Sequence, residues 1–148
     1  MNDTTAPGHG APASGTTSST SSTSSTDDRS VVESLVAEWL TLPDVAEALG
    51  TEVSKVRGLV SERSLVGMKR GERNTFQVPA VFLVTDDGAP HVLPTLRGTV
   101  LVLSDVGLDD TAVLRWLFEV EPTIGAAPIE ELRAGRRAQV RRVAQALL

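Results

Sequence analysis

The sequence predicts a mainly α-helical fold: a polar N-terminal tail, two short helices joined by a tight turn, a short β-hairpin and a group of C-terminal helices. Three observations support this prediction. Twelve of the 13 residues from 14 to 26 are Ser or Thr, so this stretch lacks the apolar side chains that offset the entropy of ordering a chain. Residues 41–60 repeat apolar residues at helical spacing on both sides of a glycine. Residues 65–78 place apolar residues two apart on either side of a turn that contains Gly and Asn.

Length and composition limit the chemistry that the chain can perform. Its 148 residues include no Cys and two His, which excludes disulfides, Cys-zinc sites and thiol nucleophiles and leaves little for metal binding. With residues 1–30 set aside as a disordered tail, about 118 remain, enough for a core. The longest apolar run, from Val78 to Val84, has seven residues, against the roughly 18 that a membrane span needs. No secretory signal is visible. We expect a cytoplasmic protein without metal or cofactor.

The charge is strongly segregated along the chain. The net charge is −5, yet residues 53–79 carry six basic and two acidic residues, and residues 132–148 carry five Arg and no acid. Because the local field decides where a polyanion binds, two basic islands in an acidic chain are compatible with nucleic-acid binding on one face. The alternative is that each island is a solvated helix face, and for the C-terminal island this is the simpler interpretation.

Residues 41–60 predict two helices. Thr41 and Asp44 have the spacing of a capping box with a proline in the first turn, and Gly50 ends the first helix. We expect Thr51 to cap the second helix, placed at residues 51–63. The predicted buried stripes are Leu42, Val45, Ala46 and Leu49, then Val53, Val56, Leu59 and Val60. So short a turn forces the two helices to cross steeply, as in a helix-turn-helix.

The exposed face of the second helix has the composition of a DNA contact. Short polar residues near a helix start let the helix approach base edges in the major groove, and long cations reach phosphates or guanine. We therefore expect helix 51–63 to enter the major groove. The predicted contacts are Ser54, Lys55, Arg57 and Ser61. Taken alone, these residues also fit a helical hairpin with a polar outer face that binds no DNA.

Residues 65–78 predict a β-hairpin whose tip, Arg70 to Asn74, is basic. A basic hairpin directly after a recognition-type helix is the layout of a wing. We place this wing at residues 68–75 and expect Lys69, Arg70 and Arg73 to contact the phosphate backbone; a generic solvated hairpin is the alternative. Residues 31–84 are thus predicted to form a winged helix-turn-helix DNA-binding domain.

Residues 85–148 predict a C-terminal helical domain, with a role in partner binding or dimerisation. An apolar stretch at 93–106 predicts a buried helix, although its β-branched residues leave a strand open for 99–103. Further helices are expected after Asp109 or Asp110, at 129–134 and at 136–147. Trp39 and Trp116 are interpreted as packing anchors. Arg137 and Arg141 lie one turn apart; they either bind DNA or, more simply, pair with upstream acids.

The order of motifs across residues 37–148 resembles a family of small actinobacterial winged helix-turn-helix DNA-binding proteins. The motifs are Trp39-Leu-Thr-Leu-Pro-Asp-Val-Ala-Glu-Ala-Leu-Gly, Val53-Ser-Lys-Val-Arg, Gln77-Val-Pro-Ala-Val-Phe, Leu96-Arg-Gly-Thr, Leu114-Arg-Trp-Leu-Phe, Pro128-Ile-Glu-Glu-Leu-Arg-Ala-Gly and Val140-Arg-Arg-Val-Ala-Gln-Ala-Leu. The resemblance implies a winged helix, a C-terminal helical domain and a link to mycobacterial-type Ser/Thr kinase signalling. The C-terminal part is also similar to the toxin-binding domain of some bacterial antitoxins, a likeness that bears on fold more than on function.

The predicted function is DNA binding, as a transcriptional regulator or nucleoid-associated factor. The expected partners are double-stranded DNA, a Ser/Thr protein kinase and a second copy of the chain, with no membrane and no small-molecule substrate. We expect no enzyme, because His91 with Asp86 or Asp87 lacks a nucleophile elbow and an oxyanion loop, and no phosphate-binding glycine motif is present. The alternative is a non-enzymatic protein-interaction adaptor or an antitoxin-like module.

The tail is the predicted place of regulation. A phosphate adds about −1.5 to −2 charge and would compete with DNA for the same cations, so we expect tail phosphorylation to weaken DNA binding. The candidates are Thr4, Thr5, Thr16, Thr17, Thr20, Thr23 and Thr26. The alternative is a plain linker.

Overall fold

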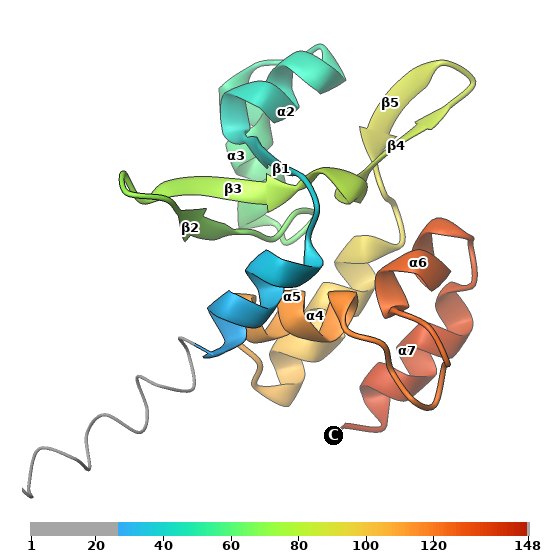
Figure 1. Cartoon of the computed structure of the whole chain (residues 1–148). Helices are drawn as coiled ribbons and strands as arrows, with labels where there is room; N and C mark the ends of the chain where they lie inside the picture. The colour runs from blue at the N-terminus through green and yellow to red at the C-terminus, as the bar shows by residue number, and fades with distance from the viewer. Residues whose placement is uncertain (1–26, 148) are drawn as a thin grey trace, which may run out of the picture.

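The computed structural model describes residues 27–147, so the seven candidate threonines lie outside the described residues. Residues 27–35 are helical. The further elements are β1 (Trp39–Thr41), α2 (Leu42–Leu49), α3 (Val53–Ser61), β2 (Met68–Arg70), β3 (Thr75–Pro79), the 3-10 helix η2 (Ala80–Phe82), β4 (Leu83–Asp86), β5 (Ala89–Val92), α4 (Leu96–Val106), α5 (Asp110–Phe118), α6 (Pro128–Arg133) and α7 (Arg137–Gln145). Figure 1 shows α2, α3 and the β-strands in the upper half, with the remaining helices below them. No helix in this described part is long and apolar enough to span a membrane.

Helix α2 begins and ends as its sequence predicts. The Thr41 hydroxyl accepts from the Asp44 N–H at 3.3 Å, and the Asp44 carboxylate accepts from the Thr41 N–H at 3.3 Å, which completes the capping box. Gly50 closes the helix at a φ of 69°, a left-handed conformation that suits glycine.

Helix α3 starts later than predicted, and the expected cap at Thr51 is wrong. The Thr51 N–H donates to the Ala46 carbonyl at 2.9 Å, so Thr51 belongs to the motif that closes α2. Glu52 takes the N-cap position without a side-chain hydrogen bond. Helix α3 therefore covers Val53–Ser61 and not residues 51–63. Val56, in the middle of its predicted apolar stripe, is fully buried.

The predicted hairpin is confirmed, as part of a larger sheet. Strands β2 and β3 pair antiparallel with Lys69 opposite Phe76, and residues 71–74 form the loop between them. The sequence did not predict β1, which pairs antiparallel with β3 and places Leu40 opposite Val78. The sheet order is β1-β3-β2.

The first strands after β3 correct the prediction of a C-terminal helical domain that starts at residue 85. Strands β4 and β5 pair antiparallel, with Asp86 opposite Ala89. Asp87 and Gly88 form the two-residue loop at φ values of 53° and 78°, the conformation of a tight hairpin turn. The predicted domain boundary between residues 84 and 85 falls inside β4.

The later helices follow the apolar pattern. Helix α4 covers Leu96–Val106, so the strand left open for 99–103 does not form. Asp109 caps α5, since its carboxylate accepts from the Ala112 N–H at 2.9 Å. Trp39 and Trp116 are half-buried and pack against the core, in line with their predicted role as anchors.

The core joins both halves of the described chain. One cluster of buried side chains includes Val45 and Val56 from the helix-turn-helix, Phe82 from η2, and Leu103 and Val140 from the C-terminal helices. The buried side chains form one continuous cluster, and the division of the chain into two domains stays a prediction.

The helix of residues 27–35 corrects the predicted extent of the tail, whose last four residues are ordered. Asp28 accepts from the Arg115 guanidinium at 2.9 Å, and this hydrogen bond raises the pKa of Arg115 above its ordinary value. The Arg29 guanidinium donates to the Lys69 carbonyl at 2.8 Å. Val32 is fully buried. Distant partners therefore order a segment whose own sequence looks polar.

Candidate nucleic-acid interface

The outer face of α3 carries all four of the contacts predicted for the recognition helix. Ser54, Lys55, Arg57 and Ser61 are exposed, and their side chains make no hydrogen bond or ion pair with any residue from 27 to 147. Gly58 lies among them, with no atom within 4 Å of the place that a Cβ would occupy. An α-helix with its side chains is about 10–12 Å in diameter, so α3 can enter the roughly 12 Å wide major groove.

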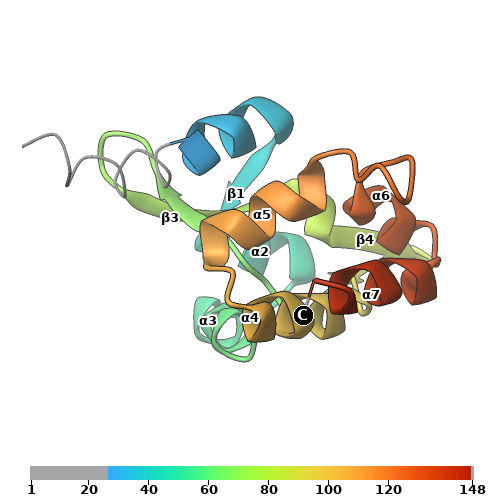
Figure 2. The same cartoon turned by 90° about the horizontal axis from the view of Figure 1, so that it is seen from below.

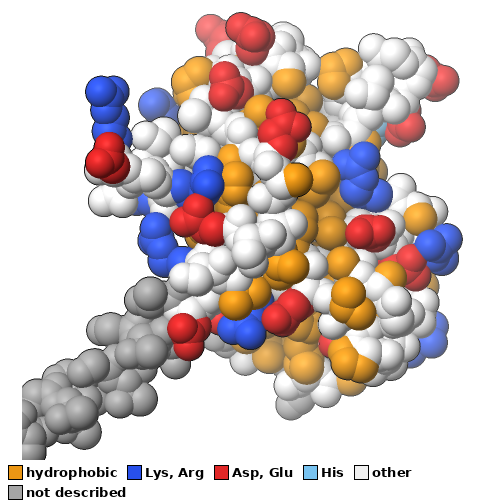
Figure 3. Space-filling model, viewed as in Figure 1, with side chains coloured by type: hydrophobic (Ala, Val, Ile, Leu, Met, Phe, Trp, Pro, Cys, Tyr) orange, Lys and Arg blue, Asp and Glu red, His pale blue; other side chains and the backbone are white. Residues whose placement is uncertain are grey.

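The wing is the loop of residues 71–74 together with the adjoining ends of β2 and β3. Lys69 and Arg73 are exposed, and within the described chain their side chains have no partner. Figure 3 shows Lys and Arg side chains (blue) over the wing at the left of the view, with an acidic side chain (red) among them. In both Figure 1 and Figure 2 the wing and α3 lie toward the left of the molecule.

Arg70 differs from the other two predicted wing cations because its side chain is partly buried and bound to other residues of the protein. Its guanidinium lies 4.4 Å from the centre of the Trp39 ring and donates to the Glu33 carboxylate at 2.7 Å. It also donates to the Gln77 side-chain oxygen at 3.0 Å. The structure thus places Arg70 at the base of the wing, where it joins the wing to the helix of residues 27–35.

Two arginines, neither of them a predicted DNA contact, fix the C-terminal end of α3. The Arg63 guanidinium donates to the Asp110 carboxylate at 2.8 Å and to the Ser104 hydroxyl at 3.0 Å. The Arg97 side chain donates to the Glu62 carbonyl at 2.8 Å. Arg63 adopts a φ of 70°, so the chain turns sharply there between α3 and β2. These bonds cross from the helix-turn-helix to α4 and α5, contacts that no local pattern in the sequence indicates.

The other candidate groups have different surroundings. His91 lies 3.3 Å from Asp86 across the exposed β4–β5 hairpin, with Ala89 as its remaining polar neighbour. No group of three or more His, Asp or Glu residues that could hold a metal occurs among residues 27–147. Arg137 and Arg141 have no acidic partner in this range, so the ion pairs with upstream acids that the sequence favoured are not formed.

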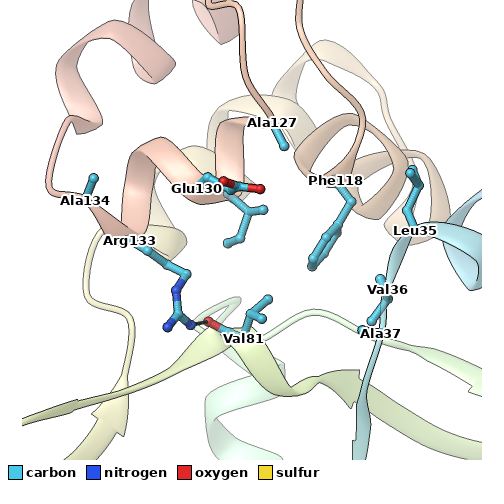
Figure 4. A pocket seen from close by; sticks show the side chains of 10 residues that line it. Leu35, Val36, Ala37, Val81, Phe118, Ala127, Glu130, Arg133 and Ala134 are labelled. Carbon is cyan, nitrogen blue, oxygen red and sulfur yellow. Dashed lines mark hydrogen bonds between the residues drawn. The ribbon is translucent and has the colours of Figure 1, made fainter.

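An apolar groove of about 540 Å³ lies away from α3. Leu35 and Val81 line it with 39% and 37% of their surface exposed, and Phe118 lies opposite Val81 (Figure 4). Ile129 also lines the groove. Arg133 closes one end, where its guanidinium donates to the Val81 carbonyl. Figure 2 places the helix of residues 27–35, which contributes Leu35, on the opposite side of the molecule from α3.

A helix-turn-helix followed by a β-hairpin with a basic loop, which forms a three-stranded antiparallel sheet with the strand before the first helix, defines a winged helix-turn-helix protein. Two family models match the chain: the winged helix-turn-helix domain of DNA-binding protein Rv2175c at residues 30–83, and the Rv2175c C-terminal domain of unknown function at residues 93–148. The chain belongs to this Rv2175c family of DNA-binding proteins.

A relative and a solved structure, both named Rv2175c, support the assignment. The DNA-binding protein Rv2175c of Mycobacterium tuberculosis (strain ATCC 25618 / H37Rv) is 36% identical over 118 residues, which cover 72% of this chain and 77% of that protein. The NMR structure of Rv2175c matches with a TM-score of 0.64 at 34% identity, covering 74% of this chain and 80% of that chain. The predicted fold class and family are confirmed, whereas the kinase link and the antitoxin likeness stay predictions.

Proposed function

We propose that the protein binds double-stranded DNA with α3 in the major groove and the wing on the phosphate backbone. Its role is that of a transcriptional regulator or nucleoid-associated factor, without catalytic activity. The observation that carries the proposal is the state of four cations, Lys55, Arg57, Lys69 and Arg73, which are exposed and have no partner among residues 27–147. Cations in this state are available to phosphates and base edges.

The decisive experiment changes Lys55 and Arg57 to Ala and measures affinity for random and genomic duplex DNA over a range of salt concentrations. Loss of the two contacts should weaken binding at least tenfold, because a base contact is worth roughly 1–3 kcal/mol and each lost phosphate contact lowers the salt slope by about 0.9. The matched control is Arg142→Ala, which removes an exposed cation from α7. Unchanged affinity in the double variant would contradict the placement of α3 in the groove.

Tail phosphorylation is the proposed control of this binding. The support is that the helix that follows the tail is bound to the wing through Arg29 and Glu33, so the tail enters the folded part beside the wing. The test compares the DNA affinity of kinase-treated and untreated protein. A variant with all seven candidate threonines changed to Ala is the control, and it should lose the response. If treated and untreated wild-type protein bind equally well, the switch does not exist.

A protein-interaction adaptor is the second candidate function, and the apolar groove is the observation that favours it. An adaptor would use the groove beside Val81 and leave α3 without a nucleic-acid ligand. Binding of random duplex DNA at micromolar concentration that falls steeply with salt supports DNA binding. No detectable DNA binding at low salt supports the adaptor.

Dimerisation is a further proposal, made because one winged helix offers only a limited surface to DNA. Sedimentation of the free and DNA-bound protein tests it.

A further inference from the structure

A small cleft of about 70 Å³ lies between α4 and α7, outside the winged helix. Arg137 and Arg141 line it from α7, and Thr95, Gly98 and Thr99 line it from the start of α4. Helix α7 packs on α4 at this point, so the cleft has walls from two helices. A solvated helix face would spread its charges over the surface, whereas here two arginines of one helix line a single depression.

The arginines of the cleft differ from Arg133 and Arg136 of the C-terminal island in lacking a partner within residues 27–147, and from Arg142, which is likewise unpaired there, in lining the cleft. Arg136 is paired with Glu131 at 2.6 Å, and Arg133 donates to the carbonyls of Val81 and Leu83. Arg137 and Arg141, by contrast, have neither a hydrogen bond nor an ion pair to any residue in the described range. The protein thus uses some arginines of the island for its own packing and leaves two beside the cleft for an anion.

The α4 wall of the cleft also suits an anion. Thr95 is the N-cap residue, but it makes no side-chain cap, and its buried hydroxyl has no partner in the described chain. The first-turn N–H groups of α4 therefore lack a side-chain acceptor, and a helix N-terminus attracts negative charge. The cleft is open at Gly98, because this residue has no side chain and no atom lies within 4 Å of the position that a Cβ would take. Two planar guanidinium forks beside such a wall match the oxygens of a phosphate.

The position of the cleft relates it to α3. Arg97, the neighbour of Gly98, donates to the carbonyl of Glu62, the residue that caps the end of α3. Figure 2 shows α3, α4 and α7 along the same lower edge of the molecule. A duplex that receives α3 in its major groove carries a strand of phosphates on each side of that helix. The flanking strand beyond the end of α3 then runs toward the cleft.

We propose that the cleft between α4 and α7 binds a phosphate of the DNA backbone, so that the C-terminal half of the chain supplies a second contact zone next to the recognition helix. This inference rests on the proposed DNA binding of α3. It assigns to Arg137 and Arg141 the role of phosphate contacts, which position the duplex without reading its sequence.

The test measures the salt dependence of duplex DNA binding by the full chain and by the single variants Arg137→Ala, Arg141→Ala and Arg142→Ala. Each of the first two should lower the slope of log K against log salt by about 0.9, equally for all DNA sequences. Together they should weaken binding on the order of tenfold or more at about 0.1 M salt. Arg142→Ala removes the same charge from α7 outside the cleft lining and should change the slope less. Equal effects of all three variants, or no effect of the first two, overturn the site.

A second variant tests the cleft without a change of charge. Gly98→Leu adds an apolar side chain to the wall of the cleft, at a position where a Cβ meets no atom within 4 Å. This variant should weaken DNA binding as the arginine variants do, while Lys55→Ala/Arg57→Ala reports on α3 separately. If the arginine and Gly98 variants bind like wild type while the α3 variant does not, the inference fails and the proposed function stands. If wild-type protein does not bind DNA at all, both fail.

Inorganic phosphate distinguishes the backbone of DNA from a free phosphate. We expect millimolar phosphate to shift the amide resonance of Gly98 in an NMR titration of the free protein, and saturating duplex DNA to displace it. A phosphate response at Gly98 that persists when DNA is bound would assign the cleft to a free phosphate and overturn its role in DNA binding.

Discussion

At the scale of single residues, Arg70 shows how a cation of a basic hairpin becomes part of the fold. Its sequence context is the same as that of Lys69 and Arg73, and all three are predicted phosphate contacts. The difference arises from Trp39 and Glu33, which lie more than 30 residues earlier in the chain and are brought to Arg70 by the sheet and by the helix of residues 27–35. No local pattern can separate the three.

Arg70→Ala should therefore destabilise the protein, and Arg73→Ala should not. The first variant loses a cation–π contact and an ion pair that is only partly exposed, together worth about 1–2 kcal/mol. The second changes an exposed side chain and should stay within about 0.5 kcal/mol of wild type. Urea unfolding of both variants measures the difference, and equal stabilities would contradict the structural role of Arg70.

Glu131 gives a second prediction at this scale, on the dependence of stability on pH. Hydrogen bonds from Arg136 lower the pKa of Glu131, against a smaller opposing effect of burial. Near and below the ordinary carboxyl pKa of about 4.3, the unfolded chain then binds more protons at this residue than the folded chain does. The stability from this pair is complete above that pH and is lost as the pH falls through the lower pKa of the folded state.

Glu131→Gln should remove that part of the acid sensitivity. Thermal unfolding from about pH 7 to pH 3 should show a smaller fall in midpoint for this variant than for wild type. The exposed neighbour Glu130, changed to Gln in the same way, is the matched control. A steeper acid profile in Glu131→Gln than in wild type would contradict the assignment.

At the scale of elements, the wing depends on the close approach of Gly67, the residue just before β2, to strand β3. A Cβ at Gly67 would lie 2.2 Å from the Gln77 carbonyl oxygen and 2.8 Å from a Val78 methyl carbon. Gly67→Ala should cost about 1–3 kcal/mol, since the nearest atom is backbone that cannot move aside. Gly58→Ala is the control. Its methyl group meets open space, and the change replaces a glycine that weakens the helix, so this variant should not be destabilised. If urea unfolding finds the two variants equally stable, the close packing of β3 on Gly67 is not as described.

The elements also show which features the sequence could predict. Helix α2 was predictable because Thr41, Asp44 and Gly50 form its ends through bonds to near neighbours. Strand β1 was not, since it has three residues and Leu40 finds its partner at Val78, far along the chain. The β4–β5 hairpin has a local signal in Asp87-Gly88, a typical turn pair, but this pair does not by itself indicate the strands on either side of it.

For the candidate interface, exposure of Lys55 and Arg57 followed from helical spacing alone, because Val56 and its stripe must face inward. The cleft between α4 and α7 could not be predicted, since Gly98 and Arg137 meet only through the packing of two helices that are distant in sequence.

At the scale of the whole molecule, the shared core has a consequence for unfolding. Buried side chains of the winged helix and of the C-terminal helices form one cluster, and Arg63 and Arg97 bond across the junction. We therefore expect residues 27–147 to unfold in one cooperative step, despite the separate family models for the two parts.

The two tryptophans allow this to be measured, because Trp39 lies in the first half and Trp116 in the second. The variants Trp39→Phe and Trp116→Phe each leave one fluorophore, and their urea transitions should overlap after correction for the stability of each variant. Circular dichroism of the same samples is the internal control. Two transitions with separate midpoints within a single sample would show that the halves unfold independently.

The open space around Gly58 separates the choice of DNA target from the packing of the fold, two properties that are usually coupled in a DNA-binding helix. A Cβ at this exposed position meets no atom within 4 Å, so we expect residues other than proline to be accepted on the outer surface of α3 without a rearrangement of the core. Randomising this single codon in a selection against many operator sequences would therefore vary target choice while leaving the scaffold nearly constant. The position is a natural starting point for retargeting the protein.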